Sequence, residues 1–310
     1  MEKNILGKTN IEISRLGIGL AEIGYQLTID DIKEAQKLLY LAIDNGINFF
    51  DTSSCYGLSE ELIGKTISSR RNEYILATKC GHARNLPEND NGQYIDWAVN
   101  TLETSIDNSL SRMNTDYVDL LQLHSCNVDI LKQGDVIDTL LRIQQSGKTR
   151  FIGYSGDNES AEWAVDSGIF DTLQTSFNLI DQKANKNIFK SATSNNMGII
   201  IKRPLANAAW GLDKPPVYGT GYADYYLDRA NKMIELGPLP DNAPKDNIEL
   251  ALFFVLAHSQ VNTAIVGTKK PEHLLSNLKS IESGSYLSED VIAELYDRFD
   301  KLGDDWFQQM

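Results

Sequence analysis

The sequence predicts an α/β fold, a (β/α)8 TIM barrel with an N-terminal β-hairpin and an additional C-terminal helix. Short runs of apolar and β-branched residues recur eight times along the chain, and helical patterns lie between them. Strict alternation of strands and helices favours right-handed crossovers and one parallel sheet. Eight strands favour closure of that sheet into a barrel. We therefore expect residues 1–310 to form a single barrel domain.

The eight candidate strands are almost continuously apolar. This is expected of parallel strands that are covered by helices on one face and by core on the other. They are LGIGL (16–20), INFFD (47–51), YILATK (74–79), VDLLQLH (118–124), RFIGYS (150–155), TLQTSF (172–177), GIIIKRP (198–204) and TAIVGT (263–268).

The segments outside the strands complete this architecture. Residues 31–46 have helical apolar spacing and end in an Asn-Gly stop signal. Residues 4–17 read as a hairpin around the turn Gly7-Lys8-Thr9-Asn10, which would plug the bottom of the barrel. Residues 288–302 form the extra helix near the C-terminus. Residues 206–246 are the one long irregular stretch, and a loop of that length inside a domain is usually functional.

A doubly wound open sheet is the alternative architecture. It would need a Gly-rich phosphate-binding turn of the form G-x-G-x-x-G after the first strand. Residues 17–24, GIGLAEIG, match that pattern loosely. The alternative therefore remains open on the sequence.

Composition excludes several classes of function. The chain has 29 basic and 43 acidic side chains and a net charge of −14, which argues against nucleic-acid or anionic-membrane surfaces. No apolar stretch approaches the ~18 residues that a membrane span requires. The N-terminus has no apolar signal-peptide region. The odd number of cysteines, Cys55, Cys80 and Cys126, predicts reduced thiols and a cytoplasmic protein.

Ionisable residues gather where the second, third and fourth strands end. Asp51 ends the second strand and Tyr56 follows five residues later, while Lys79 and His124 end the next two strands. Catalytic side chains of barrels of this kind come from the carboxyl ends of the strands. Each of the four has a structural interpretation when taken singly, such as a strand exit or a satisfied core histidine. Four such residues on successive strand ends make coincidence much less probable.

Three segments carry a specific resemblance. FFDTSSCYG (49–57), ILATKCG (75–81) and LLQLHS (120–125) resemble the catalytic segments of the aldo-keto reductase superfamily. The match continues in order to residues 277–278, over nearly the whole chain. The resemblance implies a (β/α)8 barrel that reduces an aldehyde or ketone with NAD(P)H, or oxidises the matching alcohol or sugar. It also implies that Asp51, Tyr56, Lys79 and His124 are the catalytic tetrad.

The chemistry of such a tetrad is coherent in its own right. Tyr56 would act as the general acid and base, although a free phenol with a pKa near ~10 is a weak acid at neutral pH. We expect the Lys79 ammonium to lower the pKa of Tyr56, and Asp51 to hold Lys79 charged and in place. His124 would donate a hydrogen bond to the carbonyl oxygen of the substrate.

The resemblance also implies the contacts of the cofactor, NADP(H), with NAD(H) as the alternative. The implied cofactor residues are Gly19, Asp51, Ser155, Gln174, Phe177, Arg203, Gly267, Thr268, Lys269, His273 and Asn277. Phe177 would stack on the nicotinamide, and Ser155 and Gln174 would bind its carboxamide.

The other end of the cofactor would meet the segment after the last strand and Arg203, which would reach the pyrophosphate. Backbone N–H groups at the start of a helix suit a phosphate. Thr268 and Lys269 would meet a 2′-phosphate, and Asn277 would lie at the adenine. His273 stands where the family often has Arg, which weakens the case for strict NADP preference.

Competing functions remain open on the sequence. A non-catalytic NADP-binding redox sensor or regulatory subunit, as in the potassium-channel beta-subunit branch, would keep the same tetrad. No metal is expected, because the cysteines form no C-x2-C pair and Lys79 would repel a cation. The expected substrate is a small carbonyl compound, with a lean toward sugar-like molecules because residues 81–97, Trp210, Trp306 and Phe307 offer aromatic and polar surfaces. The sequence leaves the oligomeric state undetermined.

Overall fold

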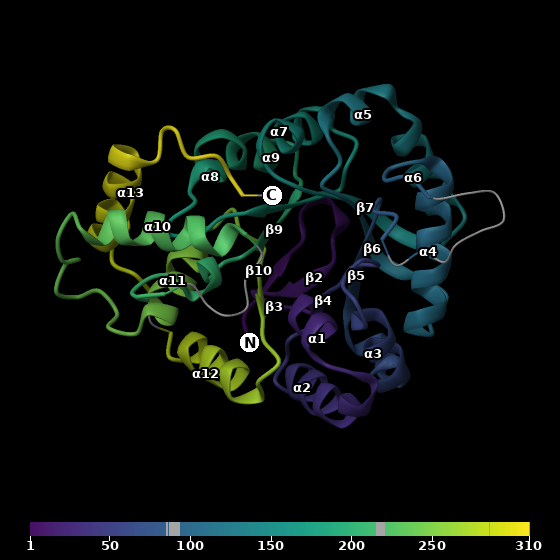
Figure 1. Cartoon of the computed structure of the whole chain (residues 1–310), viewed down its shortest axis with the longest axis horizontal. Coiled ribbons are helices and arrows are strands. Elements are labelled where there is room, and N and C mark those ends of the chain that lie inside the picture. The colour runs from purple at the N-terminus through teal and green to yellow at the C-terminus, as the bar shows by residue number, and fades with distance from the viewer. Residues whose placement is uncertain (85, 87–93, 215–220, 285, 310) are drawn as a thin grey trace.

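Eight parallel strands form a closed barrel in the computed structural model, which describes residues 1–84, 86, 94–214, 221–284 and 286–309 (Figure 1). The strand order is β10-β3-β4-β5-β6-β7-β8-β9, and β10 pairs with β3 to close the barrel. This closure confirms the predicted fold class and excludes the open doubly wound sheet. The strands are β3 Leu16–Gly19, β4 Phe49–Asp51, β5 Ile75–Cys80, β6 Val118–His124, β7 Thr149–Ser155, β8 Thr172–Ser176, β9 Gly198–Lys202 and β10 Thr263–Gly267.

The strand register brings the polar strand ends to one rim. Gly19 of β3 lies between Asp51 of β4 and Gly267 of β10, and His124 of β6 pairs with Ser155 of β7. Because parallel strands all end at the same edge, the side chains at these positions surround one opening.

Helices cover the outer face of the barrel, as Figure 1 shows. Their apolar faces pack on the strands, and side chains such as Leu38, Leu39 and Ile106 are fully buried there. The helices are α1 Ala21–Gln26, α2 Ile32–Asp44, α3 Ser59–Thr66, α4 Val99–Met113, α5 Val128–Gln133, α6 Asp135–Gln145, α7 Asn158–Asp166, α8 Lys183–Asn187, α9 Phe189–Ser194, α10 Tyr222–Ile234, α11 Asn247–Leu256, α12 Pro271–Glu282 and α13 Glu289–Leu302. Among the described residues, no helix is long and apolar enough to cross a bilayer.

The N-terminal hairpin closes the bottom of the barrel, as predicted. Its strands are β1 Lys3–Ile5 and β2 Glu12–Ser14, joined through the short 3-10 helix Gly7–Thr9. Leu6 and Ile13 lie in a cluster with inward-facing barrel residues such as Phe49. Gly7 has φ +50, and a Cβ there would lie 2.3 Å from the backbone nitrogen of Gly198, so only glycine permits this approach.

The segment 206–246 is more regular than predicted. It contains helix α10, whose buried residues Ala223, Tyr226, Ala230 and Met233 follow helical spacing. The prolines and tyrosines around this pattern obscured it in the sequence. The predicted C-terminal helix is present as α13, and the chain then runs back toward the middle of the molecule (Figure 1).

Candidate active site

A tight turn after β4 carries Tyr56 over the barrel opening. The backbone N–H of Thr52 donates to the carbonyl of Ala77 at 2.9 Å, and the N–H of Tyr56 donates to the carbonyl of Ser53 at 3.0 Å. Gly24 of α1 packs directly on this turn, where a Cβ would lie 2.0 Å from the carbonyl oxygen of Tyr56. The glycine that resembled a phosphate-binding motif therefore serves packing, and it fixes the position of the tyrosine.

Asp51 and Lys79 form a buried ion pair beneath Tyr56. The Lys79 Nζ donates to Asp51 Oδ2 at 2.6 Å and to the carbonyl of Thr52 at 2.8 Å, and the two side chains are 0% and 2% exposed. The second carboxylate oxygen, Oδ1, accepts hydrogen bonds from Gln122 Nε2 at 3.0 Å and Gln174 Nε2 at 2.7 Å. A buried charge needs such full pairing to be tolerated. Asp51 thus holds Lys79 in one place.

Tyr56 lies beside this pair, with the Lys79 Nζ 4.8 Å from the centre of its ring. The pKa of Tyr56 is nevertheless raised well above its usual value, because loss of water around the phenol dominates and the charge of Asp51 adds to it. The lowering that was expected from Lys79 does not dominate in the protein alone, because burial and the charge of Asp51 raise this pKa. The hydroxyl therefore keeps its proton at neutral pH.

His124 faces Tyr56 across the opening. The two rings meet edge to face with centroids 5.8 Å apart, and Trp97 Nε1 donates to the His124 carbonyl at 2.9 Å. Burial lowers the pKa of His124 well below its usual value, and the charges of Lys79, His82, Lys202 and Arg203 lower it further. The imidazole is therefore neutral at neutral pH.

The structure thus brings the four predicted tetrad residues together and adds two partners of Asp51, of which only Gln122 was missed by the sequence analysis. Gln122 and Gln174 both orient Asp51, whereas Gln174 was expected only at the cofactor. A signal for Gln122 was present, because it lies two residues before His124 and strand alternation puts both on one face.

The residues expected at the nicotinamide lie in two different places, Ser155 and Gln174 at the rim and Phe177 in the helical layer. Ser155 Oγ donates to Gln174 Oε1 at 2.9 Å, and both side chains are buried beside Asp51 at the rim. Phe177 does not fit its expected stacking role. Its ring is fully buried against Phe189 and His258, at 5.0 and 4.7 Å between centroids, so it presents no face to a ligand. The residue follows the end of β8 and turns outward into the helical layer.

Asp157 and Lys202 form a second buried ion pair near the rim, with Nζ and Oδ2 2.8 Å apart. Asp157 also accepts hydrogen bonds from Thr175 Oγ1 and from the backbone and side chain of Ser176. Burial alone would raise the pKa of Asp157, but the charges of Lys202 and Arg203 and these hydrogen bonds bring it below its usual value. Asp157 is therefore held as a carboxylate.

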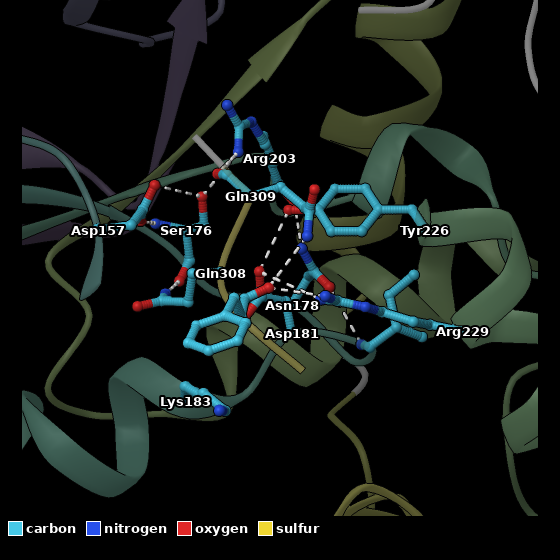
Figure 2. Close-up of polar contacts among 12 residues, drawn as sticks. Asp157, Ser176, Asn178, Asp181, Lys183, Arg203, Tyr226, Arg229, Gln308 and Gln309 are labelled. Atoms are coloured by element: carbon cyan, nitrogen blue, oxygen red, sulfur yellow. Dashed lines mark hydrogen bonds and ion pairs between the residues drawn. The ribbon is translucent and has the colours of Figure 1, made fainter. Parts of the chain in front are cut away.

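The C-terminal segment of the chain lies on this part of the rim, as Figure 2 shows. Arg203 donates to the Gln309 carbonyl and, at 3.2 Å, to Ser176 Oγ. Gln308 is almost fully buried, and its side chain donates to the Ser176 carbonyl at 2.8 Å. The amide of Asn158 donates to the Gln308 carbonyl and accepts from the Gln308 backbone N–H, at 3.1 and 3.2 Å.

The same segment is held from its other side by Arg229, which donates to the Phe307 carbonyl at 2.6 Å. Arg229 also lies 4.0 Å from Asp181 Oδ2, and Tyr226 donates to the same oxygen at 3.4 Å. Burial, followed by the nearby charge of Asp157, raises the pKa of Asp181 to about 7. Sequence reasoning assigned Arg203 to this region but gave no signal that the chain's own end would contact it.

The segment after β10 lies at the surface. Gly267 is exposed, Thr268 is buried, and Lys269 is partly buried just before α12. Thr268 Oγ1 lies 3.4 Å from His273 Nδ1 and accepts from the Lys270 N–H at 3.1 Å, which shapes the start of the helix. Asn277 faces the core side of α12 and is 6% exposed. The contacts predicted for these residues remain predictions.

The described residues contain no group of three or more His, Cys, Asp or Glu side chains that could hold a metal ion. The three cysteines are free and buried. Of the aromatic residues expected near the substrate, Trp210 belongs to the core and Phe307 is 72% exposed. His82 lies nearer the chemistry, with its ring 4.8 Å from that of His124 and its Nδ1 3.0 Å from Asp96 Oδ2.

Comparisons with known proteins agree with this geometry. The model of the Aldo/keto reductase family matches residues 15–297. YqkF of Bacillus subtilis, an uncharacterized oxidoreductase, is 28% identical over 94% of this chain and 95% of its own. L-galactose dehydrogenase of Arabidopsis thaliana is 28% identical over 91% and 88%. Among solved structures, the holo form of aldo-keto reductase AKR11C1 from Bacillus halodurans superposes with a TM-score of 0.80, at 26% identity and 96% coverage of both chains.

Proposed function

Because this chain belongs to the aldo/keto reductase family, we propose that it reduces an aldehyde or ketone with NAD(P)H, using Tyr56 as the general acid. The observation that carries the proposal is the Lys79 ammonium, which is held 4.8 Å from the Tyr56 ring by a fully paired Asp51. In the reverse direction the same site would oxidise the matching alcohol or sugar.

The residues at the rim fit an anionic dinucleotide. Lys202 ends β9 and Arg203 follows it, and after burial their charges are among those that lower the pKa of His124. Arg203 donates to the Gln309 carbonyl and the Ser176 hydroxyl, and a phosphate is a stronger partner for a guanidinium than neutral acceptors of this kind. We assign the pyrophosphate to Arg203, and the adenosine end to Thr268, Lys269 and Asn277.

The bound cofactor supplies a hydride to the carbonyl carbon. The chain supplies the proton: Tyr56, protonated at neutral pH, donates to the carbonyl oxygen as negative charge develops there. Lys79 stabilises the phenolate left behind, and Asp51 keeps Lys79 positioned for this. His124 donates a hydrogen bond to the same oxygen and orients the carbonyl.

The substrate we propose is a small carbonyl compound, with sugars as the first candidates. His82 and Trp97 beside His124 offer a polar and an aromatic surface at the opening. Similarity to an L-galactose dehydrogenase supports including aldoses in the panel.

Turnover by the purified protein tests the proposal. NADPH or NADH would be mixed with 4-nitrobenzaldehyde or with a panel of aldoses, and absorbance of the reduced nicotinamide would be followed. We expect steady oxidation of one cofactor. Tight NADPH binding without turnover of any carbonyl would instead support a non-catalytic NADP-binding regulator.

A further inference from the structure

Two side chains outside the tetrad, the Ser53 hydroxyl and the Cys55 thiol, lie close to Nδ1 of His124. Ser53 Oγ lies 3.4 Å from His124 Nδ1, and Cys55 Sγ lies 3.5 Å from the same atom. The two side chains are also 3.2 Å from one another. Ser53 is 2% and Cys55 6% exposed, so bulk water does not fill this triangle.

The hydrogens carried by Ser53 Oγ and Cys55 Sγ indicate whether His124 Nδ1 acts as an acceptor or as a donor. Ser53 Oγ already accepts the backbone N–H of Cys55 at 3.4 Å, and a thiol sulfur is a weak acceptor. The hydroxyl and the thiol each bring one hydrogen. The lone pair of an unprotonated Nδ1 is the strongest acceptor within reach, and it takes a hydrogen directly from either group. A protonated Nδ1 would place three hydrogens among these atoms and leave the thiol without a good acceptor.

We propose that Ser53 and Cys55 are positioning residues that hold His124 with Nδ1 as acceptor and its proton on Nε2. The consequence for catalysis rests on the proposed function: Nε2–H is then the donor presented to the carbonyl oxygen of the substrate. In neutral histidine, the hydrogen bond at one ring nitrogen decides which nitrogen carries the proton. With the opposite tautomer, Nε2 would present a lone pair to an oxygen and would repel the carbonyl.

The charges around His124 are compatible with a neutral ring. Lys79 from β5, His82 after β5, and Lys202 and Arg203 from the end of β9 all disfavour the imidazolium. Burial raises the pKa of the Cys55 thiol, so its hydrogen is retained at neutral pH. Tyr56 packs edge to face on the same ring and is protonated as well.

The tautomer is measured directly by 15N NMR of protein labelled at histidine. The chain has four histidines, and a His124→Asn sample assigns the resonances of His124 by their loss. We expect Nδ1 to resonate as an unprotonated nitrogen and Nε2 as a protonated one near neutral pH. In Ser53→Ala/Cys55→Ala, the two resonances should move toward one another as the tautomers mix. A wild-type spectrum with the proton on Nδ1 overturns the proposal, whatever the activity.

Kinetics provide the second readout. Ser53→Ala and Cys55→Ala each keep one donor, so each should retain kcat/KM within about threefold, while the double variant should lose about tenfold or more. The acid limb of its kcat/KM profile should also shift to higher pH, because Nδ1 without a donor is more easily protonated. The Kd for NADPH should not change. Cys80→Ala removes an equally buried thiol in β5 and is the matched control.

Two outcomes separate this proposal from the proposed function. Wild-type protein with the expected tautomer but no carbonyl turnover would refute the reductase and leave the role of Ser53 and Cys55 standing. Turnover in which the two single losses simply add up to the double loss, with an unchanged pH profile and unchanged 15N resonances, would reduce Ser53 and Cys55 to packing residues.

Discussion

The two sides of the barrel rim differ in how ready they are for chemistry. On one side, called here the closed side, Asp51 of β4 and Lys79 of β5 form a buried pair, and Asp51 also accepts hydrogen bonds from Gln122 of β6 and Gln174 of β8, so these partners all lie on barrel strands. On the side of β8 and β9, Arg203 is bound by the C-terminal segment of the chain itself. The proton-transfer machinery is thus preorganised, whereas the surface assigned to the pyrophosphate must exchange a partner before it binds one.

The largest change in unfolding free energy should come from breaking the buried ion pair of the closed side. Lys79→Met leaves the Asp51 carboxylate buried without its cation, and breaking a buried pair costs about 3–5 kcal/mol of unfolding free energy. Asp51→Asn/Lys79→Met removes both charges and should recover much of that loss, although neither variant should reduce carbonyls. Denaturant titration measures both. The exposed pair Lys3–Glu12 is the control, and Lys3→Ala should change stability by less than about 1 kcal/mol.

Asp181, beneath the C-terminal segment, should make stability depend on pH. Its folded pKa of about 7 lies above the value of 3.8 expected when unfolded, so the folded state binds the extra proton. Its contribution is therefore full at low pH and is lost as pH rises from about 4 to about 7, at up to about 1.4 kcal/mol per pH unit. Asp157, Arg229, Arg203 and Tyr226 set this pKa together with burial.

Asp181→Asn should therefore flatten the profile of unfolding free energy between pH 5 and pH 8 and be more stable than the wild type at pH 8. Urea titrations at several pH values measure it. An unchanged slope in the variant would assign the pH dependence to other groups.

Removing residues 307–310 tests the side of the rim where the C-terminal segment binds Arg203. The truncation deletes the carbonyls that Arg229 and Arg203 bind but keeps Trp306, which packs on Phe299. We expect NADPH to associate several-fold faster, because Arg203 no longer has to exchange its partner. Stopped-flow nicotinamide fluorescence gives the association and dissociation rates. Phe307→Ala, which changes an exposed side chain and keeps the backbone, is the matched control. Faster dissociation with unchanged association would mean that the segment clasps the cofactor instead.

The smallest effect expected is on the pH profile of reduction. Tyr56 keeps its proton to well above pH 10, and His124 stays neutral to well below pH 6.5, so both are in their active forms between these limits. The rate constant for hydride transfer should therefore change by less than about twofold between pH 7 and pH 9. A pre-steady-state pH series measures it, and a tenfold fall across that interval would contradict the assigned protonation states.

Much of the closed side could be read from the sequence, because its residues end successive strands. Asp51, Lys79 and His124 lie at the carboxyl ends of apolar runs, and parallel strands bring such ends together. The barrel itself followed from eight strands alternating with helices. The direction of the Tyr56 pKa could not be read there, since it depends on how burial and Asp51 balance Lys79 in three dimensions.

The other side of the rim depended on contacts that no local pattern encodes. Phe177 lies close to a strand end, as the tetrad residues do. It is the first residue after β8, and its ring turns into the helical layer. Gln308 meets Asn158 across 150 residues of sequence, so no spacing rule could pair them. Helix α10 was hidden because its apolar face is built partly from alanine and tyrosine within a segment rich in turn residues.

The most direct test of proton donation by Tyr56 compares Tyr56→Phe with the wild type in single turnovers of enzyme-bound NADPH with 4-nitrobenzaldehyde. The substitution removes only the hydroxyl and keeps the ring beside Lys79. We expect an unchanged Kd for NADPH and a hydride-transfer rate lowered by about 10²–10⁴-fold. A Tyr56→Phe protein that reduces the aldehyde at the wild-type rate would contradict it.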